Sequence, residues 1–231
     1  MKIVLSVITA VIMLLSTTVS ADSEDLKTLQ KQKDWYIVKQ DNIRQITTYA
    51  KHEEGKSIRS FKVDAVVDAP LVTLASVHFD VANIKKWYWE TLESKLITKV
   101  SDTEYVYYLK FRTPLAEDRD VVLKATIEPY KLGQNNYMLL SLRATPSALP
   151  IPPNITRISA FDMDIKFKPL LDGKTKMEVQ GFVDPSGSLP AWTVNLVQHQ
   201  APYATMLGLY RMTQKAEYTN IKMPLAFRYA Q

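Results

Sequence analysis

The chain has 231 residues, of which 46% are apolar, and a formal net charge of +5 at pH 7. This is enough for one large domain with a substantial core. The basic residues are scattered rather than gathered in a stripe, which argues against nucleic-acid binding and favours at most a weak attraction to anionic membrane surfaces. The absence of cysteine excludes disulfides and a lipid anchor on cysteine.

The segment Met1–Ala21 predicts a secretory signal peptide. Lys2 supplies a positive start, Ile3–Leu15 is a short apolar run, and Val19-Ser20-Ala21 resembles a cleavage site. The run is too short to span a bilayer comfortably, so an uncleaved anchor is the weaker alternative. We therefore expect cleavage near Ala21, a bacterial periplasmic location, and a single mature domain over residues 22–231.

The first part of the mature chain predicts a mixture of helix and strand. Ser23–Lys33 is typical of a short amphipathic helix. Two strands and a longer one follow, before two helical segments that end in Trp87, Tyr88 and Trp89. These elements are, in order, strands Asp34–Gln40, Ile43–Lys51 and Ser57–Val67, then helices Leu71–Asp80 and Val81–Glu90.

The middle of the chain alternates apolar and polar residues, as antiparallel strands with one buried face do. The alternation is clear at Tyr105, Tyr107, Leu109 and Phe111. A proline-rich break over Pro146–Thr156 interrupts it. The predicted strands are Ser94–Ser101, Glu104–Arg112, Arg119–Tyr130, Asn136–Thr145, Arg157–Lys168 and Lys174–Val183, which brings the total to about nine.

A long helix is predicted at the end of the chain. Asp184-Pro185-Ser186-Gly187 is a strong turn signal, Ser188 suits an N-cap, and Pro190 suits the first helical turn. Apolar residues then recur to about Thr219, with a bend expected at Pro202. A helix that is apolar on more than one face needs a concave sheet to receive it. We therefore predict an α+β fold, a curved antiparallel sheet wrapped around the C-terminal helix.

This order of elements resembles the START (StAR-related lipid-transfer) domain, a helix-grip fold related to Bet v 1. Trp35, Trp87 and Arg119-Asp120 agree with the family, as does Asp184-Pro185-x-Gly187-x-x-Pro190-x-Trp192-x-x-Asn195. The resemblance covers about residues 23–219. It implies a tunnel between sheet and helix that holds one lipid (a sterol, a phospholipid or another apolar molecule) and needs no cofactor.

Strand alternation and the resemblance together suggest which residues line that tunnel, although the same stripe also suits a solid core. The family often places an acid–base pair inside its cavity, so charged residues on the strands are included among the candidates. Alternation does not decide to which face of its strand Arg143 points. Arg119-Asp120 is more plausible as a pair that braces the end of its strand than as a lipid contact. The candidates are Tyr107, Leu109, Phe111, Arg119, Asp120, Arg143, Arg157, Phe161, Met163, Val179, Val194, Val197, Met206 and Leu209, with Ile165 and Met177 beside them.

Two loops are candidate gates. Pro114–Asp118, with Leu115, lies where the family has an Ω-loop over the tunnel mouth. The loop carrying Leu149, Ile151 and Ile155 is apolar enough to dip into a membrane during transfer, or it folds back on the sheet.

Enzyme chemistry has little support in the sequence. His52, His78 and His199 lack metal-ligand spacing, and no nucleophile motif or phosphate loop occurs. We expect a monomeric lipid-binding or lipid-transfer protein with transient membrane contact and with no catalytic residue, metal or cofactor. The alternatives are a lipid sensor or assembly factor, and a relative of the polyketide aromatase/cyclases.

Overall fold

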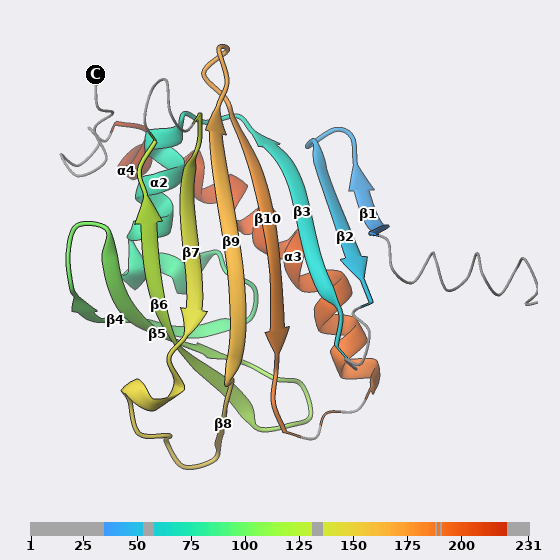
Figure 1. Ribbon diagram of the computed structural model, residues 1–231. Helices are drawn as coiled ribbons and strands as arrows, with labels where there is room; N and C mark the ends of the chain where they lie inside the picture. Colours follow the sequence, from blue (N-terminus) through green and yellow to red (C-terminus); the bar gives the residue numbers. More distant parts are fainter. Residues whose placement is uncertain (1–34, 53–57, 131–135, 188, 190, 221–231) are drawn as a thin grey trace, which may run out of the picture.

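A computed structural model describes residues 35–52, 58–130, 136–187, 189 and 191–220. The predicted signal peptide, the helix Ser23–Lys33 and the capping residues Ser188 and Pro190 lie outside the described residues. The described chain folds as one ten-stranded sheet whose strand order is β1-β2-β3-β10-β9-β7-β6-β5-β4, with β8 beside β6 (Figure 1). Every neighbouring pair on that path is antiparallel.

The predicted strands are present with small shifts at their ends. They are β1 (Tyr36–Asp41), β2 (Ile46–Lys51), β3 (Ser60–Val67), β4 (Thr91–Lys99), β5 (Glu104–Phe111), β6 (Asp118–Glu128), β7 (Met138–Ala144), β9 (Ala160–Pro169) and β10 (Thr175–Asp184). The tenth, β8 (Ile155–Arg157), was not predicted as a separate strand: Ile155 and Thr156 were expected in the proline-rich break, and Arg157 at the start of the next strand. Instead it pairs in parallel with β6, because β7 leaves β6 beyond Ala144 and the vacated edge at Asp118–Asp120 needs hydrogen-bond partners.

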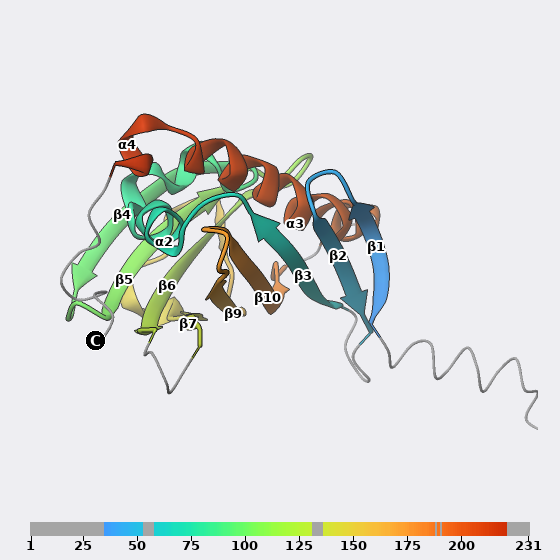
Figure 2. The same cartoon turned by 90° about the horizontal axis from the view of Figure 1, so that it is seen from above.

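The helices lie on one face of the sheet, as Figure 2 shows from above. They are α2 (Leu71–Phe79), the 3₁₀ helix η1 (Val81–Lys86), α3 (Ala191–Thr213) and the short α4 (Ala216–Thr219), while a second 3₁₀ turn, η2 (Pro146–Ala148), belongs to the loop after β7. The long helix was expected to continue to about Thr219, but it breaks after Thr213. The curved sheet around a C-terminal helix confirms the predicted helix-grip architecture.

The prediction of a helix over Val81–Glu90 was wrong beyond Lys86. Trp87 leaves helical geometry with φ −137°, and Glu90 has a positive φ of 50°. Three consecutive residues, Trp87, Tyr88 and Trp89, line the same cavity. A helix turns 100° per residue, so it cannot present three neighbours to one side.

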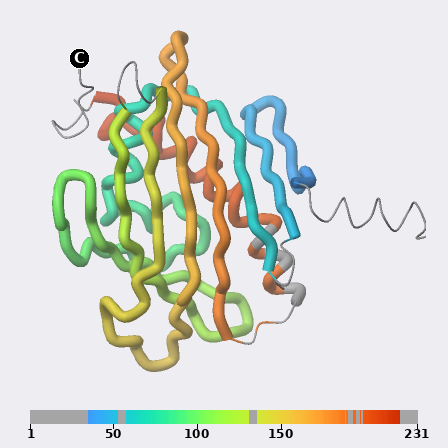
Figure 3. Tube along the Cα trace, viewed as in Figure 1, coloured from blue at the N-terminus to red at the C-terminus, as the bar shows by residue number. Residues whose placement is uncertain are grey.

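The first hairpin and the last helix lie side by side, as the blue and orange-red segments of Figure 3 show. The Tyr203 hydroxyl of α3 donates to Asp41 Oδ2 at 2.6 Å, and Lys39 Nζ lies 3.7 Å from the centre of the Tyr203 ring. Pro202 lies inside α3, one residue before this contact. The β1–β2 hairpin therefore holds the middle of α3 against the sheet.

Candidate functional site

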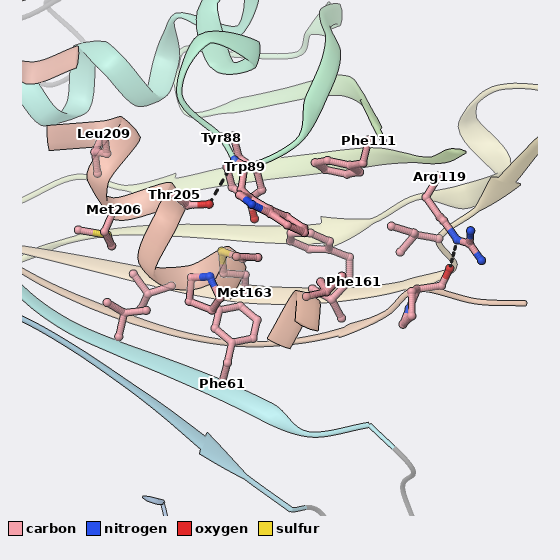
Figure 4. Close-up of a pocket in the computed structure, with 18 of the residues that line it drawn as sticks. Phe61, Tyr88, Trp89, Phe111, Arg119, Phe161, Met163, Thr205, Met206 and Leu209 are labelled. Carbon is pink, nitrogen blue, oxygen red and sulfur yellow. Dashed lines mark hydrogen bonds between the residues drawn. The ribbon is translucent and has the colours of Figure 1, made fainter. Parts of the chain in front are cut away.

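A cavity of about 190 Å³ lies between the inner face of the sheet and α3 (Figure 4). Alternate residues of β3, β9 and β10 form its floor, and α3 forms its roof. Most of the wall is apolar: Phe61, Val63, Phe111, Ile158, Phe161, Met163, Ile165, Met177, Val179, Val183, Val194, Val197, Met206 and Leu209 line it. An apolar cavity with a few polar groups is the usual form of a ligand site.

Many of the candidate residues lie in this wall. They are Phe111, Arg119, Phe161, Met163, Val179, Val194, Val197, Met206 and Leu209, together with Ile165 and Met177. Strand parity succeeds here because β9 and β10 are paired without a register shift, from Thr175 opposite Pro169 to Asp184 opposite Ala160. That these side chains contact a ligand remains a prediction.

Tyr107 and Leu109 do not line this cavity. Both point to the inner face of the sheet but surround a void of only about 20 Å³, together with Ile84 of η1 and Leu123 of β6. Burial raises the pKa of the Tyr107 hydroxyl well above its ordinary value. Strand alternation gave the correct face but not the position along the strand, and α2 and η1, rather than α3, cover this part of the sheet.

Asp120 and Arg157 are also absent from the wall of the larger cavity, because they bind each other. Arg157 Nε donates to Asp120 Oδ1 at 2.6 Å and Nη2 donates to Oδ2 at 2.9 Å. Asp120 is 0% exposed and Arg157 is 7% exposed. Arg157 also donates to the backbone carbonyls of Pro146, Leu149 and Pro150, so the pair braces the proline-rich loop against β6.

Arg143 lies on the outer face of the sheet, and its placement in the cavity was wrong. Its Nη2 lies 2.8 Å from Asp164 Oδ1 and its Nη1 lies 3.3 Å from Asp162 Oδ1. Its side chain is partly exposed. Leu140 and Leu142 of the same strand occupy the inner face, so the more apolar set of alternate residues in β7 faces inward and Arg143 faces outward.

Arg119 is a buried cation in the cavity wall. It is 5% exposed, and its guanidinium donates to the backbone carbonyls of Glu117, Pro185 and Ser186. Ser186 and Gly187 have positive φ angles of 58° and 67°, and this turn brings the two carbonyls of the 185–186 segment to Arg119. Burial lowers the pKa of Arg119 below its usual value, although the side chain stays cationic near neutrality.

The aromatic segment Trp87-Tyr88-Trp89 is a part of the wall that the sequence analysis did not assign to the site. The Trp89 backbone N–H donates to Thr205 Oγ1 of α3 at 3.3 Å. A Cβ atom at Gly208 would collide with the Trp87 carbonyl oxygen, so glycine permits the close approach of α3 to this segment. The Trp87 indole N–H is buried without a hydrogen-bond partner among the described residues. In the sequence, the run of three consecutive aromatic residues was the signal that could have identified this part of the wall.

The candidate gate residues differ in exposure. Leu115 is 90% exposed, with a positive φ of 58°, and Ile151 is 59% exposed. Leu149 and Ile155 are half-buried, and the carbonyl of Leu149 is bound by Arg157. Two apolar side chains are thus presented to solvent, one on each loop.

The described part of the chain contains no group of three or more His, Asp or Glu side chains arranged to hold a metal ion. Within the same residues, none of the helices has the length and apolar character needed to cross a membrane.

The comparisons with known proteins agree with this architecture. The START domain family model matches residues 18–212, so the chain belongs to the START domain family. An uncharacterised protein of Pseudomonas aeruginosa is 26% identical over 184 residues, which cover 79% of this chain and 88% of that protein.

Two solved structures are informative. The STAR-related lipid transfer protein of Xanthomonas axonopodis has a TM-score of 0.70 and 25% identity, covering 78% of this chain and 99% of that one. The Zhui aromatase/cyclase of Streptomyces has a TM-score of 0.51 and 14% identity, covering 69% and 97%, which is a similarity of fold alone. Lipid-transfer relatives support lipid binding in general.

Proposed function

We propose that this protein is a periplasmic lipid-binding protein that holds one hydrophobic ligand between the sheet and α3 and transfers it between membranes. The observation that carries the proposal is the apolar cavity itself, whose wall combines β3, β9 and β10 with both halves of α3. The lipid-transfer relatives support the same class of ligand. The signal-like segment Met1–Ala21 supports the periplasmic location.

Affinity in such a site comes from removing apolar ligand surface from water. Each buried methylene contributes about 0.8 kcal/mol, so a single acyl chain would offset the several kcal/mol that immobilising a ligand costs. No specific polar contact is needed for this gain. The cavity should therefore accept several apolar molecules, and polar groups at its ends would select among them.

Transfer also requires release at a membrane. The C-terminal half of α3 is fixed by the Thr205–Trp89 hydrogen bond and by the close contact at Gly208, whereas Pro202 removes one backbone hydrogen bond from the helix. Leu115 and Ile151 offer exposed apolar contacts to a bilayer surface. We propose that the protein docks through these two loops and opens on the side of α3 that precedes Pro202.

The test is to express the full chain with its signal in a Gram-negative host and to purify it from the periplasmic fraction without detergent. Native mass spectrometry should show one lipid per chain, and extraction should identify its class. A persistently ligand-free mass after incubation with sterols, phospholipids and fatty acids would overturn the proposal. Recovery of the protein only from the cytoplasm would overturn the proposed location.

Movement of labelled lipid between donor and acceptor vesicles then separates transfer from sensing. Wild type should accelerate the exchange, and Leu115→Ser combined with Ile151→Ser should slow it while leaving ligand binding unchanged. A protein that binds lipid without accelerating exchange would instead be a sensor or assembly factor.

A further inference from the structure

We infer that the cavity selects amphiphiles with an anionic head group, a carboxylate or a phosphate, which Arg119 binds at one end of the cavity. This inference rests on the proposed function and names the class of ligand. Figure 4 shows Arg119 beyond Phe111 and Phe161, while Met206 and Leu209 lie at the opposite end. A single-chain amphiphile with its head at Arg119 would thus extend its tail between aromatic rings toward α3.

The first argument is that Arg119 makes no ion pair with a carboxylate of the described residues, although Glu117 and Asp118 lie near enough to offset part of the cost of burying its charge. No Asp or Glu of the described residues lies within ion-pair distance of the Arg119 guanidinium, although the residue is only 5% exposed. Its two acidic neighbours are engaged elsewhere: Asp118 lies 3.3 Å from Lys110 Nζ, and Glu117 accepts from Thr156 Oγ1 at 3.0 Å. A buried cation without a directly bound carboxylate is costly, and burial outweighs the two nearby charges in its effect on the pKa of Arg119, so a ligand anion would relieve that cost.

The second argument is the count of hydrogen-bond donors. A guanidinium has five N–H groups, and Arg119 uses one on Nε, one on Nη1 and one on Nη2 for backbone carbonyls. One N–H on each terminal nitrogen remains without a partner among the described residues. Paired donors of this kind match the two oxygens of a carboxylate or phosphate.

The third argument is the charge of the whole wall. Arg59 and Arg112 also line the cavity, and no described acidic residue does. Arg157 provides the contrast, because Asp120 binds it bidentately and both lie outside the wall. The chain therefore neutralises one buried arginine internally and leaves the other facing a ligand site.

The experiment compares two anions with neutral partners of the same chain: oleate with methyl oleate, and oleoyl lysophosphatidate with monoolein. Each is titrated by calorimetry into the delipidated mature protein. Because charged hydrogen bonds contribute strongly, wild type should bind at least one anion about 10- to 100-fold more tightly than its neutral partner. The preferred pair distinguishes a carboxylate from a phosphate.

Arg119→Gln should reduce this preference to less than about threefold. Arg143→Gln, which removes a partly exposed arginine from the outer face, is the matched control and should keep the full preference. An undiminished preference in Arg119→Gln would overturn the inference. If that variant does not fold, wild type decides alone, because equal binding of anions and neutral partners overturns the inference while leaving the proposed function intact. Failure of all four probes to bind would overturn the inference, and the lipid extraction and native mass spectra described above then decide the proposed function separately.

Discussion

The buried pair Asp120–Arg157 should contribute to stability rather than to ligand binding. Asp120→Asn removes the negative charge and leaves the Arg157 guanidinium buried beneath the proline-rich loop. Breaking one partner of such a pair costs about 3–5 kcal/mol. Arg157 retains three backbone carbonyl acceptors, so we expect the lower end, about 3 kcal/mol, which for a domain of this size lowers the melting temperature by roughly 6–12 °C.

Urea unfolding followed by tryptophan fluorescence at pH 7 measures this loss. Arg143→Gln, which disrupts a partly exposed pair, should change the free energy of unfolding by less than about 0.5–1 kcal/mol. Asp120→Leu combined with Arg157→Met should be less destabilised than Asp120→Asn, because no unpaired charge remains buried. A loss below 1 kcal/mol in Asp120→Asn, or a folded variant that no longer binds lipid, would refute this assignment.

Three further outcomes follow from single contacts. Burial lowers the pKa of His78 to about 4, whereas the unfolded chain has a pKa of about 6.5, so the free energy of unfolding should fall by about 3 kcal/mol as pH drops from 6.5 to 4. Urea unfolding across this pH range should show a weaker pH dependence for His78→Phe than for wild type. The hydrogen bond from Tyr203 holds the pKa of Asp41 well below its usual range, so the contribution of ionised Asp41 to stability is complete above about pH 4 and is lost as pH falls further. Acid unfolding followed by circular dichroism should show that Asp41→Asn lacks this part of the transition. Gly208→Ala should destabilise the protein by about 1–3 kcal/mol despite the better helix propensity of alanine, because the added Cβ would meet the Trp87 backbone. A higher free energy of unfolding in urea for this variant would contradict the close contact between α3 and Trp87.

The fold was largely predictable because period-two alternation reports one buried face, and β5, β6, β9 and β10 alternate clearly. Cavity residues were less predictable, because alternation identifies a face and not the element that covers it. Leu109 and Phe111 share a face of β5, yet only Phe111 reaches the larger cavity. The difference lies in where η1 and α3 cross the sheet, which depends on contacts between residues distant in sequence.

Arg119 and Arg157 show the same limit for charge. Both arginines lie at or beside the start of a predicted strand, and their surroundings in the sequence do not distinguish them. The parallel pairing of β8 with β6 places Arg157 directly opposite Asp120. Successive residues of a strand point to opposite faces, so the carboxylate that neutralises Arg157 faces away from the cavity that Arg119 lines. The alternation of β6 thus leaves Arg119 without an ion pair, and β8 supplies the arginine that Asp120 binds on the other face, so the selectivity proposed for the cavity depends on the direction of one strand residue.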